Sequence, residues 1–262
     1  MSGAEYCKLL KENKKLKLIK NVLETSLNHK THGKMFSIVT STWNPISGCL
    51  YDCRYCWAKN LALTKLKTTK RYANGFKPSL NISEFRVRFG NGDIVFVADM
   101  GDMFAPSIPD KWIKQVLEHI EQFPDADFLF MTKNPKRYLD LLPFIPQNAI
   151  LGATIETNID SIISGDKVSL APPPSERAEA MKNLEWDRKI VSIEPVLEFD
   201  LKTLVKWLTD IDPFIVYVGY DNYCNRLHEP SMQQTLNLMQ HLSDNALVIK
   251  KTIRPAWSED SK

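Results

Sequence analysis

Short apolar runs alternate with stretches of helical periodicity along most of the chain. The runs are rich in Val, Ile and Phe and show no strict alternation with polar residues, which is typical of strands buried on both faces of a parallel sheet. The predicted strands are residues 36–41, 94–100, 128–132, 150–155, 190–193 and 214–219, with a later one at 246–250.

Helices are predicted between these strands. In residues 110–123, apolar side chains recur with helical spacing, and Pro109 stands directly before them. Ser231 follows a proline and is the predicted N-cap of the last helix. The predicted helices are residues 58–71, 110–123, 135–142, 175–184, 201–208 and 231–242. Six strand–helix units predict an α/β fold with right-handed crossovers, as an open doubly wound sheet or a partial barrel.

The composition is that of a globular protein. The chain has 262 residues, 44% of them hydrophobic and 25% charged, which excludes a disordered chain and suits one domain with a sizeable core. No apolar run approaches the ~20 residues that span a bilayer. The N-terminus is polar and lysine-rich, without the apolar core of a signal peptide, so we expect a cytoplasmic protein. We expect a basic helical N-terminal extension over residues 1–35 and one domain over residues 36–262.

The net charge of +3 is unevenly distributed. Residues 1–35 carry eight lysines against three glutamates, and residues 59–77 carry six basic residues and no acidic one. Two basic blocks on an otherwise acidic chain indicate an anionic partner such as nucleic acid, or simply solvated helix faces.

Three of the five cysteines lie close together in a loop between a predicted strand and a predicted helix. Cys49, Cys53 and Cys56 have the spacing C-x3-C-x2-C, and soft thiolate ligands favour iron–sulfur clusters or zinc. A structural zinc site uses four ligands, and residues 57–86 contain no His or Cys. Three protein ligands leave a position open for substrate, although a zinc site or buried thiols remain alternatives.

With the aromatic Tyr55 before the third cysteine, this motif resembles C-x3-C-φ-C of the radical S-adenosylmethionine (SAM) superfamily. The resemblance implies a 4Fe–4S cluster bound by Cys49, Cys53 and Cys56, with SAM on the fourth iron. It implies that one electron cleaves SAM to methionine and a 5′-deoxyadenosyl radical, which abstracts a hydrogen atom from a substrate. It further implies a partial (βα)6 barrel and an electron donor such as flavodoxin or ferredoxin.

Four more segments resemble one uncharacterised, often phage-encoded branch of this superfamily. They are T-W-N-P at 42–45, M-T-K-N-P at 131–135, G-A-T-I-E at 152–156 and S-I-E-P at 192–195. The branch carries similar segments in the same order, but usually has a longer insertion between its first two cysteines. The branch by itself implies no substrate.

Polar residues follow the predicted strands, where barrel active sites form. Asp99, Gly101 and Asp102 take the place of the superfamily's glycine-rich motif for the SAM amine, although the sequence here departs from Gly-Gly-Glu. Lys133 is a point charge for the SAM carboxylate. The predicted SAM-binding residues are Tyr55, Asp99, Gly101, Asp102, Lys133, Thr154, Glu156 and Glu194. The alternatives are a packing role for the tyrosine, a solvated loop for the lysine and structural ion pairs for the two glutamates.

The substrate is open. Cys224 follows the sixth predicted strand and is a candidate hydrogen-atom donor, although a lone cysteine is commonly a small buried hydrophobe. Lys65, Lys67 and Lys70 are candidate contacts to a polyanion. The leading hypothesis is a radical SAM enzyme acting on a nucleotide or nucleic acid. The alternatives are a radical SAM enzyme acting on a peptide or small metabolite, and a metal-binding nucleic-acid module without catalysis.

Overall fold

The computed structural model describes residues 15–16, 19–20, 23–24 and 35–259. The predicted basic extension over residues 1–35 therefore lies almost entirely outside the described residues. Those of its residues that are described before residue 35 are helical.

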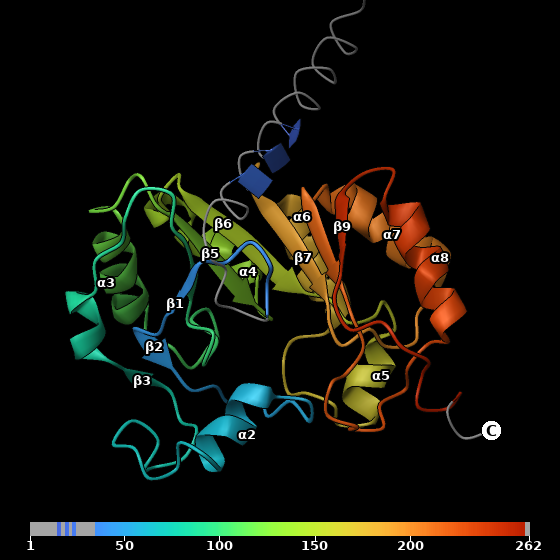
Figure 1. The fold of residues 1–262 in the computed structure, drawn as a ribbon, viewed down its shortest axis with the longest axis horizontal. Coiled ribbons are helices and arrows are strands. Elements are labelled where there is room, and N and C mark those ends of the chain that lie inside the picture. The colour runs from blue at the N-terminus through green and yellow to red at the C-terminus, as the bar shows by residue number, and fades with distance from the viewer. Residues whose placement is uncertain (1–14, 17–18, 21–22, 25–34, 260–262) are drawn as a thin grey trace, which may run out of the picture.

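The centre of the fold is a seven-stranded parallel sheet (Figure 1). Each strand of this sheet pairs in parallel with the strand of the same sheet that follows it in sequence. Every connection between paired strands is therefore a crossover. The strands are β1 (Ser41–Trp43), β4 (Ile94–Val97), β5 (Asp127–Thr132), β6 (Ala149–Thr154), β7 (Lys189–Ile193), β8 (Ile215–Val218) and β9 (Leu247–Lys250). The predicted α/β class is confirmed. Because β1 and β9 do not pair with each other, the described strands form an open sheet and not a closed barrel.

The helices follow the predicted order with two differences. They are α2 (Trp57–Leu63), α3 (Asp110–Ile120), α4 (Lys136–Leu141), α5 (Asp160–Gly165), α6 (Pro174–Asn183), α7 (Leu201–Ile211) and α8 (Met232–Leu242). Helix α8 begins with a capping box of Ser231 and Gln234, which confirms the predicted N-cap. Helix α5 was not predicted. Among these described helices, none combines the length and apolar character that crossing a membrane requires.

The predicted helix over residues 58–71 is wrong beyond Leu63, because the chain continues in turns up to Gly75. Helix α2 buries only Ala58 and Ala62, and the lysine-rich part after it packs on the same cluster through Leu66 and Tyr72 in turns, without a continuous helical stripe. Further short elements were not predicted. They are the antiparallel pair β2 (Ile46–Ser47) and β3 (Ser79–Leu80), and the 3-10 helices η1 (Ile82–Arg86) and η2 (Leu142–Phe144).

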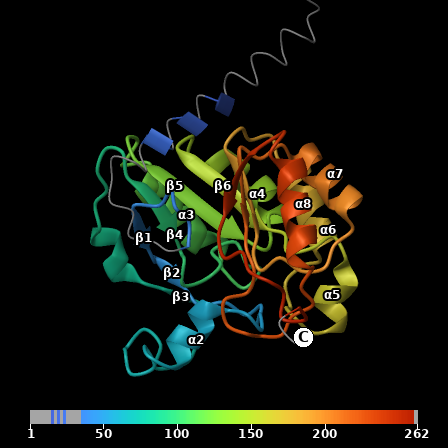
Figure 2. The ribbon, with the colours of Figure 1, turned by 45° about the vertical axis from the view of Figure 1, so that its right-hand side comes forward.

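One face of the sheet packs against the helices (Figure 2). Alternate strand residues such as Val97, Phe130 and Val191 join a cluster with Ile113 of α3 and Leu204 of α7. Figure 2 shows α6, α7 and α8 grouped beside the sheet, and contacts link α6 to α7 and α7 to α8. Burial on this face explains half of the apolar positions in the strands.

The opposite face is covered by the chain itself at residues 36–39. Phe36, Ile38 and Val39 pack against strand residues such as Phe96 and Tyr217. The predicted first strand over 36–41 is therefore wrong in position: the strand begins at Ser41, and residues 36–39 form a turn. The apolar residues of this run are buried, but they pack on the face of the sheet opposite the helices and do not form a strand there. Since both faces are buried, the strands show no alternation in sequence.

Candidate functional site

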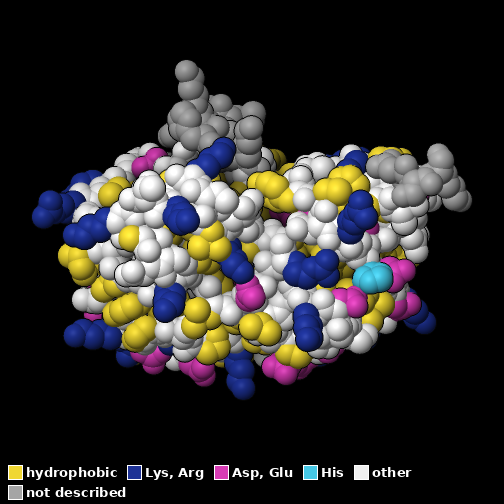
Figure 3. Space-filling model, turned by 90° about the horizontal axis from the view of Figure 1, so that it is seen from below, with side chains coloured by type: hydrophobic (Ala, Val, Ile, Leu, Met, Phe, Trp, Pro, Cys, Tyr) yellow, Lys and Arg dark blue, Asp and Glu magenta, His cyan; other side chains and the backbone are white. Residues whose placement is uncertain are grey.

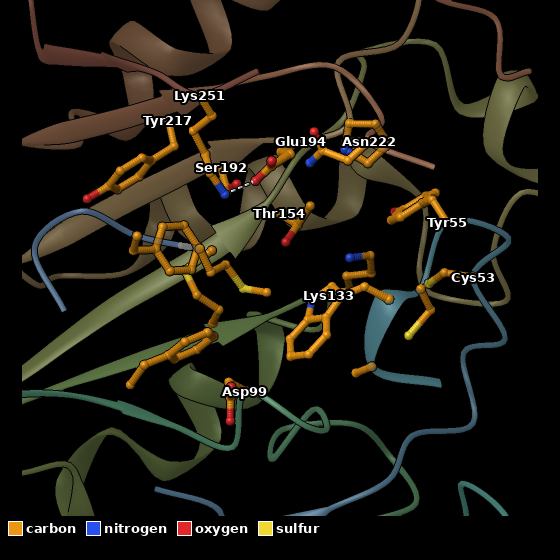
Figure 4. Close-up of a pocket in the computed structure, with 18 of the residues that line it drawn as sticks. Cys53, Tyr55, Asp99, Lys133, Thr154, Ser192, Glu194, Tyr217, Asn222 and Lys251 are labelled. Carbon is orange, nitrogen blue, oxygen red and sulfur yellow. Dashed lines mark hydrogen bonds and ion pairs between the residues drawn. The ribbon is translucent and has the colours of Figure 1, made fainter. Parts of the chain in front are cut away.

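A cavity of about 980 Å³ lies at the carboxyl ends of the parallel strands (Figure 4). The structure brings ten of the twelve predicted site residues to its walls: Cys49, Cys53, Tyr55, Cys56, Asp99, Gly101, Asp102, Lys133, Thr154 and Glu194. Two predicted residues, Glu156 and Cys224, do not line it. Parallel strands end at one edge of the sheet, so residues far apart in sequence converge there.

Two glycines hold the cysteine loop against the end of β4. The Gly48 N–H donates to the Met100 carbonyl at 2.8 Å, and Gly48 forms a parallel bridge with Gly101. Gly48 has φ of 86°, and a Cβ on it would overlap the Lys77 carbonyl. A Cβ on Gly101 would lie 2.9 Å from the Gly48 oxygen. Close packing of backbone therefore requires a glycine at 101, whatever that residue also contributes to a ligand.

The three thiols of the loop are free and partly buried. The Cys56 sulfur accepts the Lys59 N–H at 3.3 Å as the N-cap of α2, and the Cys53 sulfur lies 3.1 Å from the Ser169 hydroxyl. Burial raises the pKa of both Cys49 and Cys56 above the ordinary value of a thiol. Their thiolate forms therefore need a positive group beside them, which a bound metal centre supplies.

Cys49, Cys53 and Cys56 are the candidate ligands of a metal centre. Within the described residues, no three side chains of His, Cys, Asp or Glu stand close enough to share one metal ion. Zinc sites and 4Fe–4S clusters both use cysteine thiolates as ligands.

Tyr51 provides a second observation on this fit. Its side chain is 6% exposed, lines the cavity, and has a hydroxyl with no hydrogen-bond partner among the described residues. A buried hydroxyl without a partner is costly, and a group bound in the cavity would supply an acceptor for it. Three free thiols and this hydroxyl are compatible with an iron–sulfur cluster. Tyr51 lies inside the cysteine motif, so its position was a signal that the sequence reasoning missed.

Lys133 brings a positive charge to the cysteines from the end of β5 (Figure 4). Its Nζ lies 5.3 Å from the centre of the Tyr55 ring and 3.7 Å from Glu156 Oε1. Burial lowers the pKa of Lys133, but neighbouring groups, among them the Glu156 carboxylate, outweigh burial and leave it raised. The amine therefore stays charged, and its side chain, 16% exposed, remains open to a ligand.

Glu156 is fully buried behind Tyr55 and Lys133, which line the cavity. It accepts hydrogen bonds from Arg177 Nη1 at 2.6 Å and from the Tyr55 hydroxyl. Burial raises the pKa of Glu156, but Arg177 and Lys133 outweigh burial and bring it below the ordinary value. Glu156 does not line the cavity itself, whereas its partners Tyr55 and Lys133 do, so its predicted contact with SAM stays a prediction. Glu156 holds Tyr55 and Lys133 in position.

Arg177 was not predicted, and no motif marks it. It comes from α6, is 1% exposed, and also donates to the Thr154 carbonyl at 3.0 Å. Its ion pair with Glu156 becomes apparent only when α6 is packed on the sheet.

Glu194 and the two aspartates lie at the cavity with different partners. Glu194 forms an ion pair with Lys251, which follows β9, and burial raises the pKa of Glu194 against the opposing effect of Lys251 (Figure 4). Asp102 accepts hydrogen bonds from the Thr132 hydroxyl at 2.7 Å and from the Lys133 N–H at 2.9 Å. Asp99 accepts one from the Asn44 amide. Asp102 therefore fixes the end of β5 as well as lining the cavity.

Cys224, the candidate hydrogen-atom donor, is exposed, and the structure does not bring it to the cavity wall. The Asp221 carboxylate accepts the N–H groups of Tyr223 and Asn225, which turns the loop after β8 outward at Cys224. Tyr223 faces the cavity in its place.

A family model described as "Protein of unknown function (DUF5131)" matches residues 35–217. This range includes all four motif segments and Cys49, Cys53 and Cys56. The chain belongs to this family. The description assigns the DUF5131 family no activity, and no curated protein matches the sequence.

Solved structures of spore photoproduct lyase are similar to this member of the DUF5131 family. A cysteine-to-serine variant of the lyase matches with a TM-score of 0.54 and 12% identity, over 80% of this chain and 76% of the lyase chain. Another variant, with bound AdoMet and dinucleoside spore photoproduct, matches with a TM-score of 0.50 and 12% identity, over 78% and 61% of the two chains. At this identity the likeness is one of fold alone.

Proposed function

We propose that the chain is a radical SAM enzyme with a partial-barrel fold, that Cys49, Cys53 and Cys56 bind a 4Fe–4S cluster, and that SAM occupies the adjoining cavity. The observation that carries the proposal is the convergence on one cavity of three free thiols, a charged lysine and a Tyr51 hydroxyl without a partner among the described residues. When bound, the cluster would supply the electron that cleaves SAM to methionine and a 5′-deoxyadenosyl radical.

The chain's own residues would bind and orient SAM. Lys133 supplies a positive charge for the SAM carboxylate beside the cysteines. Tyr55, fixed by its hydrogen bond to Glu156, presents its ring at the cavity wall. Thr154 and Glu194, at the ends of β6 and β7, offer hydrogen-bonding groups on the far side.

Anaerobic reconstitution with iron and sulfide tests the cluster. We expect one 4Fe–4S cluster per chain, with its brown absorbance, and loss of both iron and colour in the Cys53→Ala variant. The matched control is Cys224→Ala, which removes an exposed thiol outside the cavity and is expected to retain the cluster. A preparation never exposed to air that holds stoichiometric zinc and no iron would contradict the proposal.

For the substrate we propose a nucleotide or nucleic acid. The support is the turn region after α2, where Lys65, Lys67 and Lys70 are exposed and form no ion pair with the described residues. Their charges face solvent at the end of the molecule that carries the cavity, where Figure 3 shows Lys and Arg side chains near the centre of the face as well as along its edges. A similar fold in the lyase has a dinucleoside ligand bound, which agrees with this class without establishing it.

Binding of labelled DNA and RNA at two salt concentrations tests this substrate class. We expect affinity to fall as salt rises, because phosphate contacts release counterions. Changing Lys65, Lys67 and Lys70 to Gln is expected to flatten the logarithmic salt dependence by up to about one unit for each phosphate that a lysine no longer neutralises. An absence of binding at low salt would favour a peptide or small metabolite as the substrate.

A further inference from the structure

The cysteine loop has a second hollow on its outer side. This outer groove, of about 650 Å³, is lined by Asp52, Cys53, Arg54, Tyr55, Cys56, Trp57, Lys59, Asn60, Leu63, Lys167, Tyr223 and Asn225. Five of these residues, Cys53, Tyr55, Cys56, Trp57 and Tyr223, also line the inner cavity. The groove and the cavity therefore meet at one boundary, which the cysteine loop and the loop after β8 form together.

Two aromatic side chains of this boundary are accessible to solvent. Tyr223, from the loop after β8, is 57% exposed, and Trp57, the first residue of α2, is half-buried. The Asp221 carboxylate accepts the Tyr223 N–H at 3.2 Å, which fixes the backbone that carries the ring. An exposed ring held beside a cavity is a platform on which a base of a nucleic acid can stack.

The outer groove also carries excess positive charge. Among the described residues that line it, Asp52 is the one carboxylate, and it forms an ion pair with Lys59. Arg54 is exposed, and its hydrogen bond goes to the carbonyl of Asn225, which leaves the charge uncompensated. Lys167 is exposed and forms no ion pair with the described residues. Two positive charges that no described carboxylate neutralises therefore line the groove.

The positive charge continues beyond the groove. Leu63, which lines the groove, precedes the exposed Lys65 by two residues, so the groove adjoins the turn region after α2. A positively charged groove with aromatic platforms is the usual means by which proteins bind single-stranded nucleic acids. In a duplex each base is stacked on its neighbours, so its face reaches a protein ring only when the base is flipped out.

We propose that the outer groove binds a single-stranded nucleic acid, with phosphates at Arg54 and Lys167 and one base stacked on Tyr223. The inference rests on the proposed function and deepens it, since it specifies an unpaired strand and assigns it residues other than the three lysines of the turn region. Because Tyr223 lines both hollows, stacking on its ring would hold a nucleotide of the strand next to the cavity that is proposed to bind SAM.

Binding of short labelled oligonucleotides to the reconstituted chain tests the stacking platform, with one sequence offered as a single strand and as a duplex. Tyr223→Ala removes the ring, and Tyr223→Phe keeps it. The control Phe144→Ala removes another exposed aromatic ring, in η2, which lines neither hollow. The cluster absorbance of each variant reports whether the cysteine loop is intact. If the alanine variant at Tyr223 loses its cluster, Tyr223→Leu replaces it.

A second pair of variants tests the charges of the groove. Arg54→Gln/Lys167→Gln removes one arginine and one lysine from the groove. The matched control Arg86→Gln/Lys111→Gln removes the same two charges from exposed positions in η1 and α3. The affinity of each variant for the single strand is measured at several salt concentrations.

We expect the single strand to bind about tenfold more tightly than the duplex, and Tyr223→Ala to weaken its binding by about tenfold, the size expected for one stacked base. Tyr223→Phe and Phe144→Ala should stay within about twofold of the parent chain. The groove charge variant should flatten the logarithmic salt dependence by up to about 1.4, because each neutralised phosphate of a single strand contributes about 0.7. The control charge variant should leave it unchanged.

Equal binding of the duplex and the single strand, or equal effects of Tyr223→Ala and Phe144→Ala, would overturn the single-strand site while leaving a nucleic-acid substrate and the proposed enzyme intact. Displacement of the single strand by polyglutamate at the same concentration of charge would overturn it in favour of an acidic peptide. An absence of binding by either nucleic acid at low salt would overturn both this site and the proposed substrate class. The cluster, measured separately by its absorbance, is tested independently of all these outcomes.

Discussion

Glu156 and Glu194 follow neighbouring strands of the sheet, β6 and β7, each two residues or fewer beyond its strand. From their positions in the sequence we expected the same role for both, but the structure separates them. Glu156 is 0% exposed and is held by Arg177 from α6, whereas the side chain of Glu194 is 17% exposed and reaches the cavity beside Lys251. The difference teaches that polar residues at corresponding strand ends differ in exposure where a helix supplies a buried partner to one of them.

The largest expected effect concerns the buried pair. Removing one partner leaves an uncompensated buried charge, so Arg177→Met should lower the free energy of unfolding by about 3–5 kcal/mol. The double variant Arg177→Met/Glu156→Gln should recover part of that loss, because the buried charge is then gone. Urea denaturation at neutral pH measures both.

The matched comparison is Glu194→Gln, which should change the free energy of unfolding by less than about 1 kcal/mol, because this ion pair is partly solvated. Equal losses for Arg177→Met and Glu194→Gln would remove the distinction between the two strand ends.

The second prediction is on ligand binding. Because Glu194 faces the cavity, Glu194→Gln should weaken SAM binding by about tenfold, the size expected for one charge-assisted hydrogen bond. The control is Glu198→Gln, an exposed glutamate that follows the same strand. Anaerobic calorimetry on the reconstituted chain gives both affinities. If SAM binds the Glu194 variant as tightly as the control, the cavity wall at β7 does not contact SAM.

The smallest expected effect is a pair of opposite pH dependences. The folded state lowers the pKa of Glu156 below 4.5, so its contribution to stability is present above that value and is lost as the pH falls through the lowered pKa. The folded state raises the pKa of Glu194 above 4.5, so its ionised form costs stability above the raised pKa, and that cost disappears as the pH falls.

Unfolding free energies measured from neutral pH to below the lowered pKa of Glu156 check these signs. Relative to the parent chain, Glu194→Gln should be favoured at neutral pH and lose that advantage in acid, whereas Glu156→Gln should show its largest deficit at neutral pH. Parallel curves for the two variants would show that burial affects both carboxylates alike.

The sequence indicated most of the sheet but misplaced its beginning. Six predicted strands match β4 to β9, because double-sided burial leaves a continuous apolar run in each. The run at 36–41 has the same composition, yet residues 36–39 cover the hollow face of the sheet. The hydrophobicity of a segment indicates that it is buried, but it does not indicate which surface it packs against. The position of the first strand therefore followed only from the packing.

The candidate site shows the same division. The cysteine spacing, the glycines and the polar strand ends are local features, and the rule that parallel strands end at one edge was enough to bring ten predicted residues together. Packing of α6 on the sheet decided the rest at β6, because only there does Arg177 meet Glu156 and withdraw it from the cavity. The turn after β8 likewise points Cys224 outward. Sequence by itself determined the cysteine spacing and the polar residues at the strand ends. Tertiary structure decided which of these residues line the cavity, since burial and ion pairing depend on neighbours that are distant in the chain.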